Sequence, residues 1–274
     1  MNRPWRRSSL LVGGVLTVAM VAMALVSLVW TPYPPTKIDI LHKLAAPSAA
    51  HLLGTDPFGR DVLSMIMAGA RSSLSVALIA VVVGAGIGIP LGALASAMGG
   101  WIDNLVMRAT DLAFAFPALL TAVMITALAG PGAVNAMLAI GIFNIPVFAR
   151  VARGAALAVR AQEFVMAARA TGRGEAAIMW RHVLPNISAV LLVQATIQFA
   201  LAIVADAGLS YLGLGTQPPF PSWGRMLNDA QTFIYRAPLL AVFPGVAITL
   251  SVLGLNLLGD GLRDLLDPRL SRER

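Results

Sequence analysis

The stretch RAQEFVMAARATGRGEAAIMWRHVLPN, residues 160–186, is the longest polar interruption in the second half of a very apolar chain. Helix formers predict one helix of about 12 residues over 160–171, about 18 Å long. Gly172 stands where a left-handed C-terminal cap is expected. A second short helix is predicted over 175–182, and Pro185 begins the next apolar helix, where its missing N–H costs little. The pattern predicts a compact two-helix knob, although an ordinary basic loop at a membrane face fits it equally well.

The chain as a whole is far more apolar than a soluble domain. Of its 274 residues, 58% are hydrophobic and 12% are charged, whereas soluble domains carry about 25% charged residues. The mean hydropathy is +0.79. The net charge of +7 comes from arginines dispersed between apolar runs, so positive flanks of membrane spans explain it better than a nucleic-acid surface. We expect an integral membrane protein with no nucleic-acid partner.

The residues that common catalytic and metal sites require are missing. The chain has no cysteine, which excludes disulfides, thiolate nucleophiles and cysteine metal sites. Gly-Lys-Ser/Thr, His-Glu-x-x-His and Gly-x-Ser-x-Gly are also absent. The three histidines lie far apart in sequence, and His182 is expected at a membrane boundary or partner contact. We therefore expect no catalytic site, no metal and no cofactor bound by this chain.

The first apolar run is predicted to be a transmembrane helix over residues 10–30. A cleaved signal peptide competes, because Ala22-Met23-Ala24 has the small residues of a cleavage site. The run continues past that point to Trp30, which favours a retained span. Residues 31–70 are mixed and rich in proline, and we expect an extramembrane segment in which Asp56, Arg60 and Asp61 form local ion pairs.

Later apolar runs predict five more spans. Residues 72–102 carry no charge, and a short polar connection with Asp103, Arg108 and Asp111 follows. Residues 112–149 are too long for one span and are broken into two at 130–132. The last two runs are 182–205 and 237–259, joined by an ordered loop over 208–236. The fold class is thus predicted to be all-α integral membrane with six transmembrane helices.

Several residues inside the runs have predicted roles. Gly84, Gly88 and Gly92 share one helix face and should let a neighbouring helix approach closely. Gln194 and Gln198 lie four residues apart and point the same way, so they are candidates for lining a pathway. Asp206 is a third candidate, although it could equally lie in solvent near the end of its helix.

Positive residues predict the orientation. Six spans place both termini on one side, and that side holds 14 of the 20 Lys and Arg residues. These are the three in residues 1–9, Arg108, six between 150 and 181, and four from 263 to 274. Because positive residues are retained in the cytoplasm, both termini and the 160–186 knob are expected to be cytoplasmic.

The knob resembles the "EAA" loop of binding-protein-dependent ABC import permeases of the dipeptide/oligopeptide/nickel class. The residues that carry the resemblance, and that it implies couple to an ATPase, are Glu163, Phe164, Ala167, Ala168, Arg169, Gly172, Ile178, Arg181, His182, Leu184 and Pro185. One position departs from the pattern, because Met166 stands where the family has the glutamate that names the loop. The resemblance implies docking into a groove of a cytoplasmic ATPase, and the departure puts a salt bridge from this position in doubt.

Three further stretches are similar to the same family. They are the Leu-Gly-Thr-Asp…Gly-Arg-Asp…Gly-Ala-Arg series of residues 53–71, the Leu-Gly-Leu-Gly…Gln-Pro-Pro…Pro-Ser-Trp-Gly series of 212–224, and the C-terminal signature of 259–270. In such systems the 208–236 surface faces the binding protein that delivers the substrate. The resemblance covers residue 51 to the C-terminus.

The resemblance implies the type I permease fold of ABC importers, in the bacterial inner membrane, as the second permease of a pair. It implies a cytoplasmic N-terminus (1–9), a first transmembrane helix (10–30), an external segment (31–70), a five-helix core with the coupling loop at 160–186 (71–270) and a cytoplasmic tail (271–274). The implied partners are a second permease, two ATPase subunits that bind ATP and Mg, an external binding protein and the lipid bilayer. Peptides are the expected cargo; nickel, opines and sugars stay open.

A secondary transporter or channel that works alone is the competing interpretation. Such proteins use buried ionisable residues and internally duplicated halves. The apolar runs carry no charge beyond the borderline Asp111 and Asp206, and we detect no duplication. A membrane enzyme is disfavoured by the missing catalytic groups.

Overall fold

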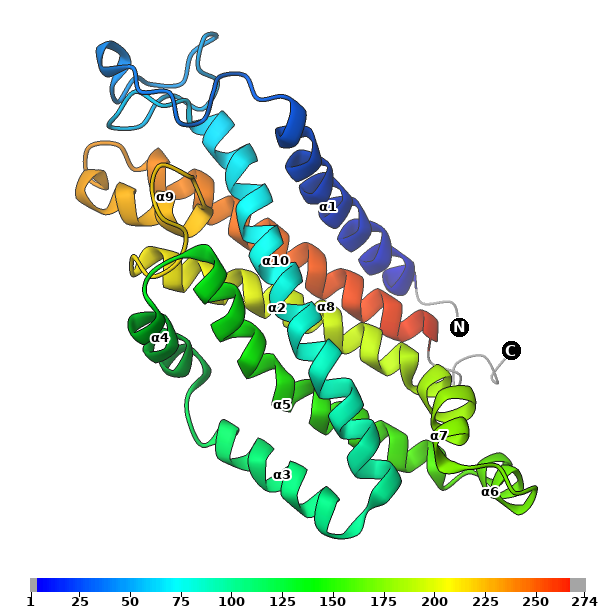
Figure 1. The fold of residues 1–274 in the computed structure, drawn as a ribbon. Coiled ribbons are helices and arrows are strands. Elements are labelled where there is room, and N and C mark those ends of the chain that lie inside the picture. Colours follow the sequence, from blue (N-terminus) through cyan, green and yellow to red (C-terminus); the bar gives the residue numbers. More distant parts are fainter. Residues whose placement is uncertain (1–3, 267–274) are drawn as a thin grey trace.

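The computed structural model describes residues 4–266 and is all-helical over this range (Figure 1). The main helices are α1 (Pro4–Val29), α2 (Val62–Met98), α3 (Gly100–Phe114), α4 (Ala118–Ala129), α5 (Ala133–Arg160), α6 (Glu163–Ala170), α7 (Glu175–Ile178), α8 (Leu184–Tyr211), α9 (Trp223–Ala230) and α10 (Leu239–Leu266). Short helical turns are η1 (Ile40–His42), the π-helical turn η2 (Met179–Val183) and η3 (Gln231–Phe233). The tail 271–274 and the end of the 259–270 signature lie outside the described residues.

Five of these helices are long and apolar enough to cross a membrane: 8–29, 62–98, 133–160, 175–211 and 239–266. A sixth crossing is available if α3 and α4 count as one span, because this pair passes the same test but bends by 85°. The six-span prediction therefore holds only with a broken third span. Pro117, which precedes α4 in an extended conformation, explains where the pair breaks.

The predicted polar connection around residue 103 is wrong, because this stretch is the helix α3. Its acidic side chains face α5: Asp103 forms an ion pair with Arg153, and Asp111 with Arg150 at 2.5 Å. The charges that suggested a loop are thus neutralised between two helices. This pairing is a tertiary contact that the local sequence does not reveal.

The close approach predicted for the glycine face of α2 is confirmed. A side chain at Gly84 would overlap Asn144, one at Gly88 would overlap Ile145, and one at Gly92 would overlap Ala149, all on α5. The two helices cross along most of their length in Figure 1. In a membrane, where apolar burial gives little driving force, such backbone proximity supplies the packing.

The first helix is a structural part of the bundle. It runs beside α10 (Figure 1), and glycines again mark the contacts: Gly13 lies against Leu257, and Gly261 against Leu10. Met20 and Ala24 are buried in the main core. These contacts agree with the prediction of a retained span.

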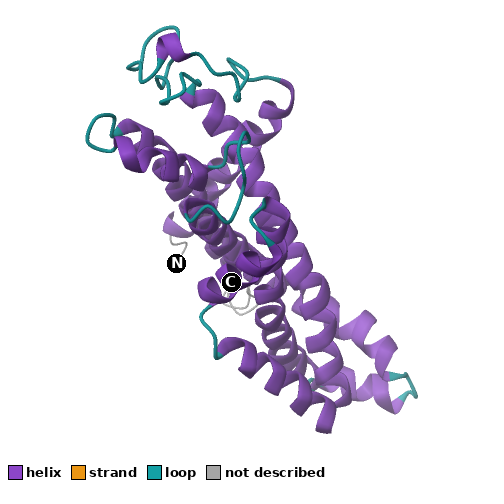
Figure 2. Ribbon diagram, turned by 60° about the vertical axis from the view of Figure 1, so that its left-hand side comes forward, coloured by secondary structure: helices purple, strands orange, loops and turns teal. Residues whose placement is uncertain are grey.

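The helices leave distinct ordered structure at the two ends of the bundle. We call the end with α6 and α7 the α6 end, and the opposite end, with residues 31–61 and α9, the α9 end (Figures 1 and 2). α1 begins and α10 ends on the side of the α6 end.

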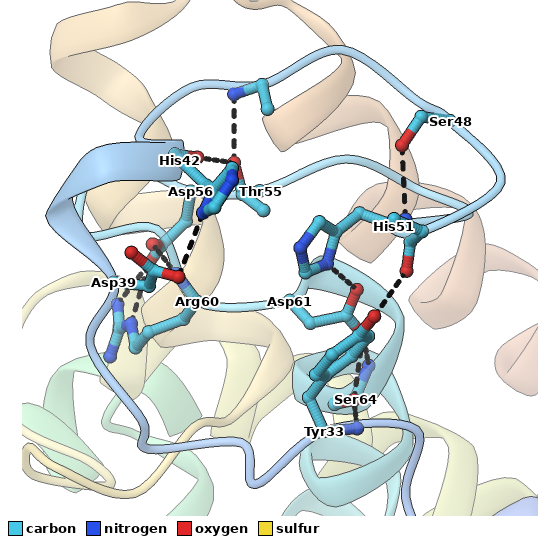
Figure 3. Close-up of polar contacts among 12 residues, drawn as sticks. Tyr33, Asp39, His42, Ser48, His51, Thr55, Asp56, Arg60, Asp61 and Ser64 are labelled. Atoms are coloured by element: carbon cyan, nitrogen blue, oxygen red, sulfur yellow. Dashed lines mark hydrogen bonds and ion pairs between the residues drawn. The ribbon is translucent and has the colours of Figure 1, made fainter.

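Residues 31–61 at the α9 end are fixed by polar contacts rather than by regular structure (Figure 3). Asp61 caps α2 by accepting hydrogen bonds from the Ser64 N–H at 2.8 Å and its hydroxyl at 2.7 Å. The predicted pair of Arg60 with Asp56 is present at 2.6 Å, whereas Asp61 lies 2.9 Å from His51 instead. Because Asp61 is the cap, helical structure starts inside the predicted external segment.

The loop 208–236 is ordered, as predicted, and the sequence analysis missed its helix α9. Trp223 is fully buried, and its Nε1 donates a hydrogen bond to the Ile66 carbonyl of α2 at 3.0 Å. Gly69 provides the space for the ring, since a side chain there would contact the Trp223 indole at 2.9 Å. This contact fastens α9 to the first turns of α2.

Candidate functional site

The knob at the α6 end begins with a break in the chain direction. Arg160 ends α5, and Gln162 is extended (φ −78°, ψ 149°), so α6 starts only at Glu163. The single helix predicted over 160–171 is therefore wrong, and α6 has eight residues. Gly172 has φ +80°, which confirms the left-handed cap.

The second predicted short helix is not separate from the span that follows. α7 passes through the π-helical turn 179–183 directly into α8. Pro185 lies at the start of α8, as predicted. Because π-helical turns interrupt the regular hydrogen-bond pattern and occur often at functional sites, the knob is continuous with a spanning helix on this side.

One carboxylate holds the two sides of the glycine turn together. Glu175 pairs with Arg160 at 2.7 Å and with Arg169 at 2.6 Å. The hydrogen bond from Glu175 raises the pKa of Arg169 above its ordinary value. The bridge joins the end of α5, the end of α6 and the start of α7, so these elements are held as one unit.

An apolar cluster anchors the knob to the bundle. Val165 and Ala168 of α6 are buried with Ile178 of α7 and Val183, against Ala156 of α5. The sequence analysis missed Val165, although its spacing of three from Ala168 places both on one helix face. The packing leaves the opposite face of α6 uncovered.

The uncovered face of α6 is apolar. Phe164 is 46% exposed and Met166 is 52% exposed. The other predicted coupling residues divide in the same way: Ala168 and Ile178 are buried, His182 and Leu184 are half-buried, and Glu163, Ala167, Arg169, Gly172, Arg181 and Pro185 are exposed. His182 Nε2 lies 3.3 Å from an Arg173 nitrogen, and its ring lies 6.1 Å from that of Phe164.

An apolar groove of about 810 Å³ adjoins the knob. It lies between α2 and the segment 175–184, and Trp180, which is 72% exposed, is part of its wall. Its other lining residues are Val82, Ala85, Gly86, Ile89, Pro90, Ala93, Leu94, Ala97, Met98, Glu175, Ala176, Met179 and Leu184.

The two glutamines predicted to line a pathway lie together, as their spacing indicated. Gln194 Nε2 donates to Gln198 Oε1 at 3.3 Å. Gln198 is buried, and its amide donates to Asn144 Oδ1 of α5 at 2.8 Å. Asn144 in turn reaches the Ala80 carbonyl of α2 at 3.4 Å. These amides therefore join three helices, and the polar Asn144 in an uncharged run was the signal that could have revealed the site.

Asp206 does not lie in solvent, because its side chain is fully buried. Ser210 donates to its Oδ1 at 3.4 Å and accepts a hydrogen bond from the Thr216 N–H at 3.2 Å. Thr216 Oγ1 lies 3.2 Å from the Ser72 hydroxyl of α2. The chain of contacts connects α8, the following loop and α2. Within residues 4–266, no three His, Asp or Glu side chains are grouped so that they could hold a metal ion.

Comparison with protein families matches residues 88–272 to the binding-protein-dependent transport system inner membrane component. The dipeptide transport system permease protein DppC of Alkalihalophilus pseudofirmus is 42% identical over 97% of this chain and 90% of its own length. The glutathione transport system permease protein GsiD of Pectobacterium atrosepticum is 42% identical over 94% of this chain and 86% of its own.

Among solved structures, the chain resembles a chain of the MetNI methionine ABC transporter in an inward-facing conformation. The TM-score is 0.62 at 19% identity, and the match covers 74% of this chain and 96% of the other. This likeness concerns the fold of the helical core.

Proposed function

This chain belongs to the family of binding-protein-dependent transport system inner membrane components, and from that premise we propose how it works as a permease of an ABC importer. The knob α6–α7 is the contact for a separate cytoplasmic ATPase subunit. The translocation pathway forms with a second permease, and peptides are the cargo, as the names of the dipeptide and glutathione relatives suggest.

The observation that carries the ATPase contact is the division of α6 into two faces. Val165 and Ala168 fasten one face to the bundle, while Phe164 and Met166 are exposed on a unit that is braced by ion pairs. A rigid element with an exposed apolar face can enter a groove of another protein and transmit its movement. Since α7 continues into α8, movement of the knob would tilt a spanning helix.

The pathway residues are ranked by their exposure. Gln194 is half-buried, so we propose it as the residue of the three that meets cargo or water. Gln198 and Asp206, which are buried within the chain, support the helices behind it.

The ATPase contact is tested by replacing exposed residues that the fold does not need. The double variant Phe164→Ala, Met166→Ala should insert normally but lose co-purification with the ATPase subunits, and uptake should fall at least about tenfold. Leu157→Ala, which is 41% exposed on the nearby α5, is the control and should keep both. Unchanged uptake and co-purification in the double variant would refute the proposed contact.

The proposed orientation, with both termini and the knob in the cytoplasm, follows from the excess of positive residues on that side. Because the chain has no cysteine, single substitutions can report on it. Arg173→Cys should be protected from a membrane-impermeant maleimide in intact cells whose outer membrane has been permeabilised, while Ser48→Cys should react. The reverse labelling pattern would overturn the orientation.

A further inference from the structure

The α9 end carries a hollow of about 340 Å³ between two segments that are distant in sequence. Residues 43–57 form one wall and residues 233–237 the other. The lining residues are Lys43, Leu44, Pro57, Phe233, Arg236 and Ala237. Two of these are cations and none is acidic, so the hollow is positively charged.

The acidic residues near this hollow are already paired with other groups. Asp39 lies 2.9 Å from His42, and this hydrogen bond holds the pKa of Asp39 below its ordinary value. Asp56 pairs with Arg60, and Asp61 with His51 (Figure 3).

The same holds on the α9 side. Asp229 pairs with Arg225 at 3.1 Å and with Arg60 at 3.4 Å. In contrast, Lys43 and Arg236 form no ion pair with any of the residues 4–266. The internal structure thus consumes the negative charge of this end and leaves two cations available at the hollow.

Large apolar side chains surround the hollow and face outwards. Leu41 is 92% exposed and Tyr235 is fully exposed, while Ile38 and Ile40 are 60% and 57% exposed. They belong to segments between the spanning helices, so the hydrocarbon of the membrane does not account for them. Exposed tyrosine and aliphatic groups beside charges at a concave surface are typical of protein interfaces.

We propose that the surface formed by residues 38–43 and 233–236 is the docking site for an acidic patch on the external binding protein, with carboxylates entering the hollow between Lys43 and Arg236. The inference rests on the proposed function, since it assigns the contact of a partner that the function requires. The positive potential would also speed the encounter, because complementary charge steers association and is weakened by salt.

The experiment uses the assembled importer, with its second permease, ATPases and own binding protein, in phosphatidylcholine vesicles. ATPase activity is titrated with the binding protein at about 50 and about 300 mM salt. The double variant Lys43→Glu, Arg236→Glu should need at least about tenfold more binding protein for half-maximal stimulation. Wild type should become weaker at high salt, and the double variant should not. Lys37→Glu is the matched control, because Lys37 is exposed on the same segment but does not line the hollow.

The outcomes separate this inference from the proposed function. Stimulation that is equal in wild type and the double variant overturns the docking site while the permease function stands. Absence of any ATPase activity dependent on the wild-type permease would instead contradict the proposed function. A defect that appears only when about a third of the lipid is phosphatidylglycerol would assign the hollow to anionic headgroups and overturn docking. Lys43→Arg with Arg236→Lys should retain stimulation, which shows that charge and not a lost fold is responsible.

Discussion

At the α9 end, buried polar groups hold the chain outside the spanning helices, whereas at the α6 end an apolar cluster does so. Asp56 and Asp61 are 5% and 3% exposed and are satisfied by fixed partners. Glu175, the carboxylate that braces the knob, keeps 45% of its side chain exposed. Buried hydrogen-bonded carboxylates demand one geometry, because an unpaired partner is costly. An exposed bridge over an apolar contact tolerates small shifts, which suits an element that must move.

The largest expected effect lies at the α9 end. Trp223→Ala removes a fully buried indole and its hydrogen bond to α2, and we expect a loss of about 3–5 kcal/mol in stability. Trp180→Ala is the matched control at the α6 end, since Trp180 is 72% exposed, and its effect should stay within about 0.5 kcal/mol. Thermal unfolding of the detergent-solubilised chain measures both. Equal effects of the two substitutions would break the comparison between the ends.

A smaller effect is expected at the start of α2. Asp61→Ala deletes the N-terminal cap and leaves buried donors without a partner, so stability should fall by about 2 kcal/mol. Asp111→Ala serves as control, because its ion pair with Arg150 has side chains 69% and 48% exposed, and such pairs contribute about 0–1 kcal/mol. Hydrogen exchange of residues 62–66 should rise only in the Asp61 variant. Increased exchange in both variants would mean that the cap has no special role.

The sequence predicted what depends on local pattern. The glycine face of α2 and the left-handed Gly172 each follow from a property of one residue type at a fixed spacing. It could not predict that Asp103 would pair with Arg153, or that Gln162 would end the helix at Arg160, because these depend on distant or neighbouring elements. The mistake at the knob came from helix propensity alone, which cannot locate a break among good helix formers.

The site shows the same division. The motif residues of the knob were identified from the sequence, but the face that each one presents was not. Whether Val165 is buried and Phe164 exposed depends on where α6 begins. Asp206 illustrates the limit most clearly: its place near a helix end left solvent open as an expectation, whereas a serine on the next turn and the following loop enclose it.

The smallest expected effect concerns the glycine turn of the knob. Gly172 has φ +80° with open space around the position of a Cβ, so Gly172→Ala adds backbone strain without a clash. We expect a cost of about 1 kcal/mol. Gly174→Ala is the control, because Gly174 has φ −67° and equally open surroundings. It should be neutral or slightly stabilising.

The two alanine variants sharpen the contrast between the ends, because both substitutions add the same methyl group two residues apart. If the knob acts as a rigid unit, straining its turn at Gly172 should lower coupling of transport to ATP hydrolysis more than it lowers overall stability. Hydrogen exchange in α6 should increase, while α9 should be unaffected, since no cluster or ion pair joins the two. Gly174→Ala should leave coupling unchanged. If both variants couple as well as wild type, the turn need not be held in one conformation for the knob to work.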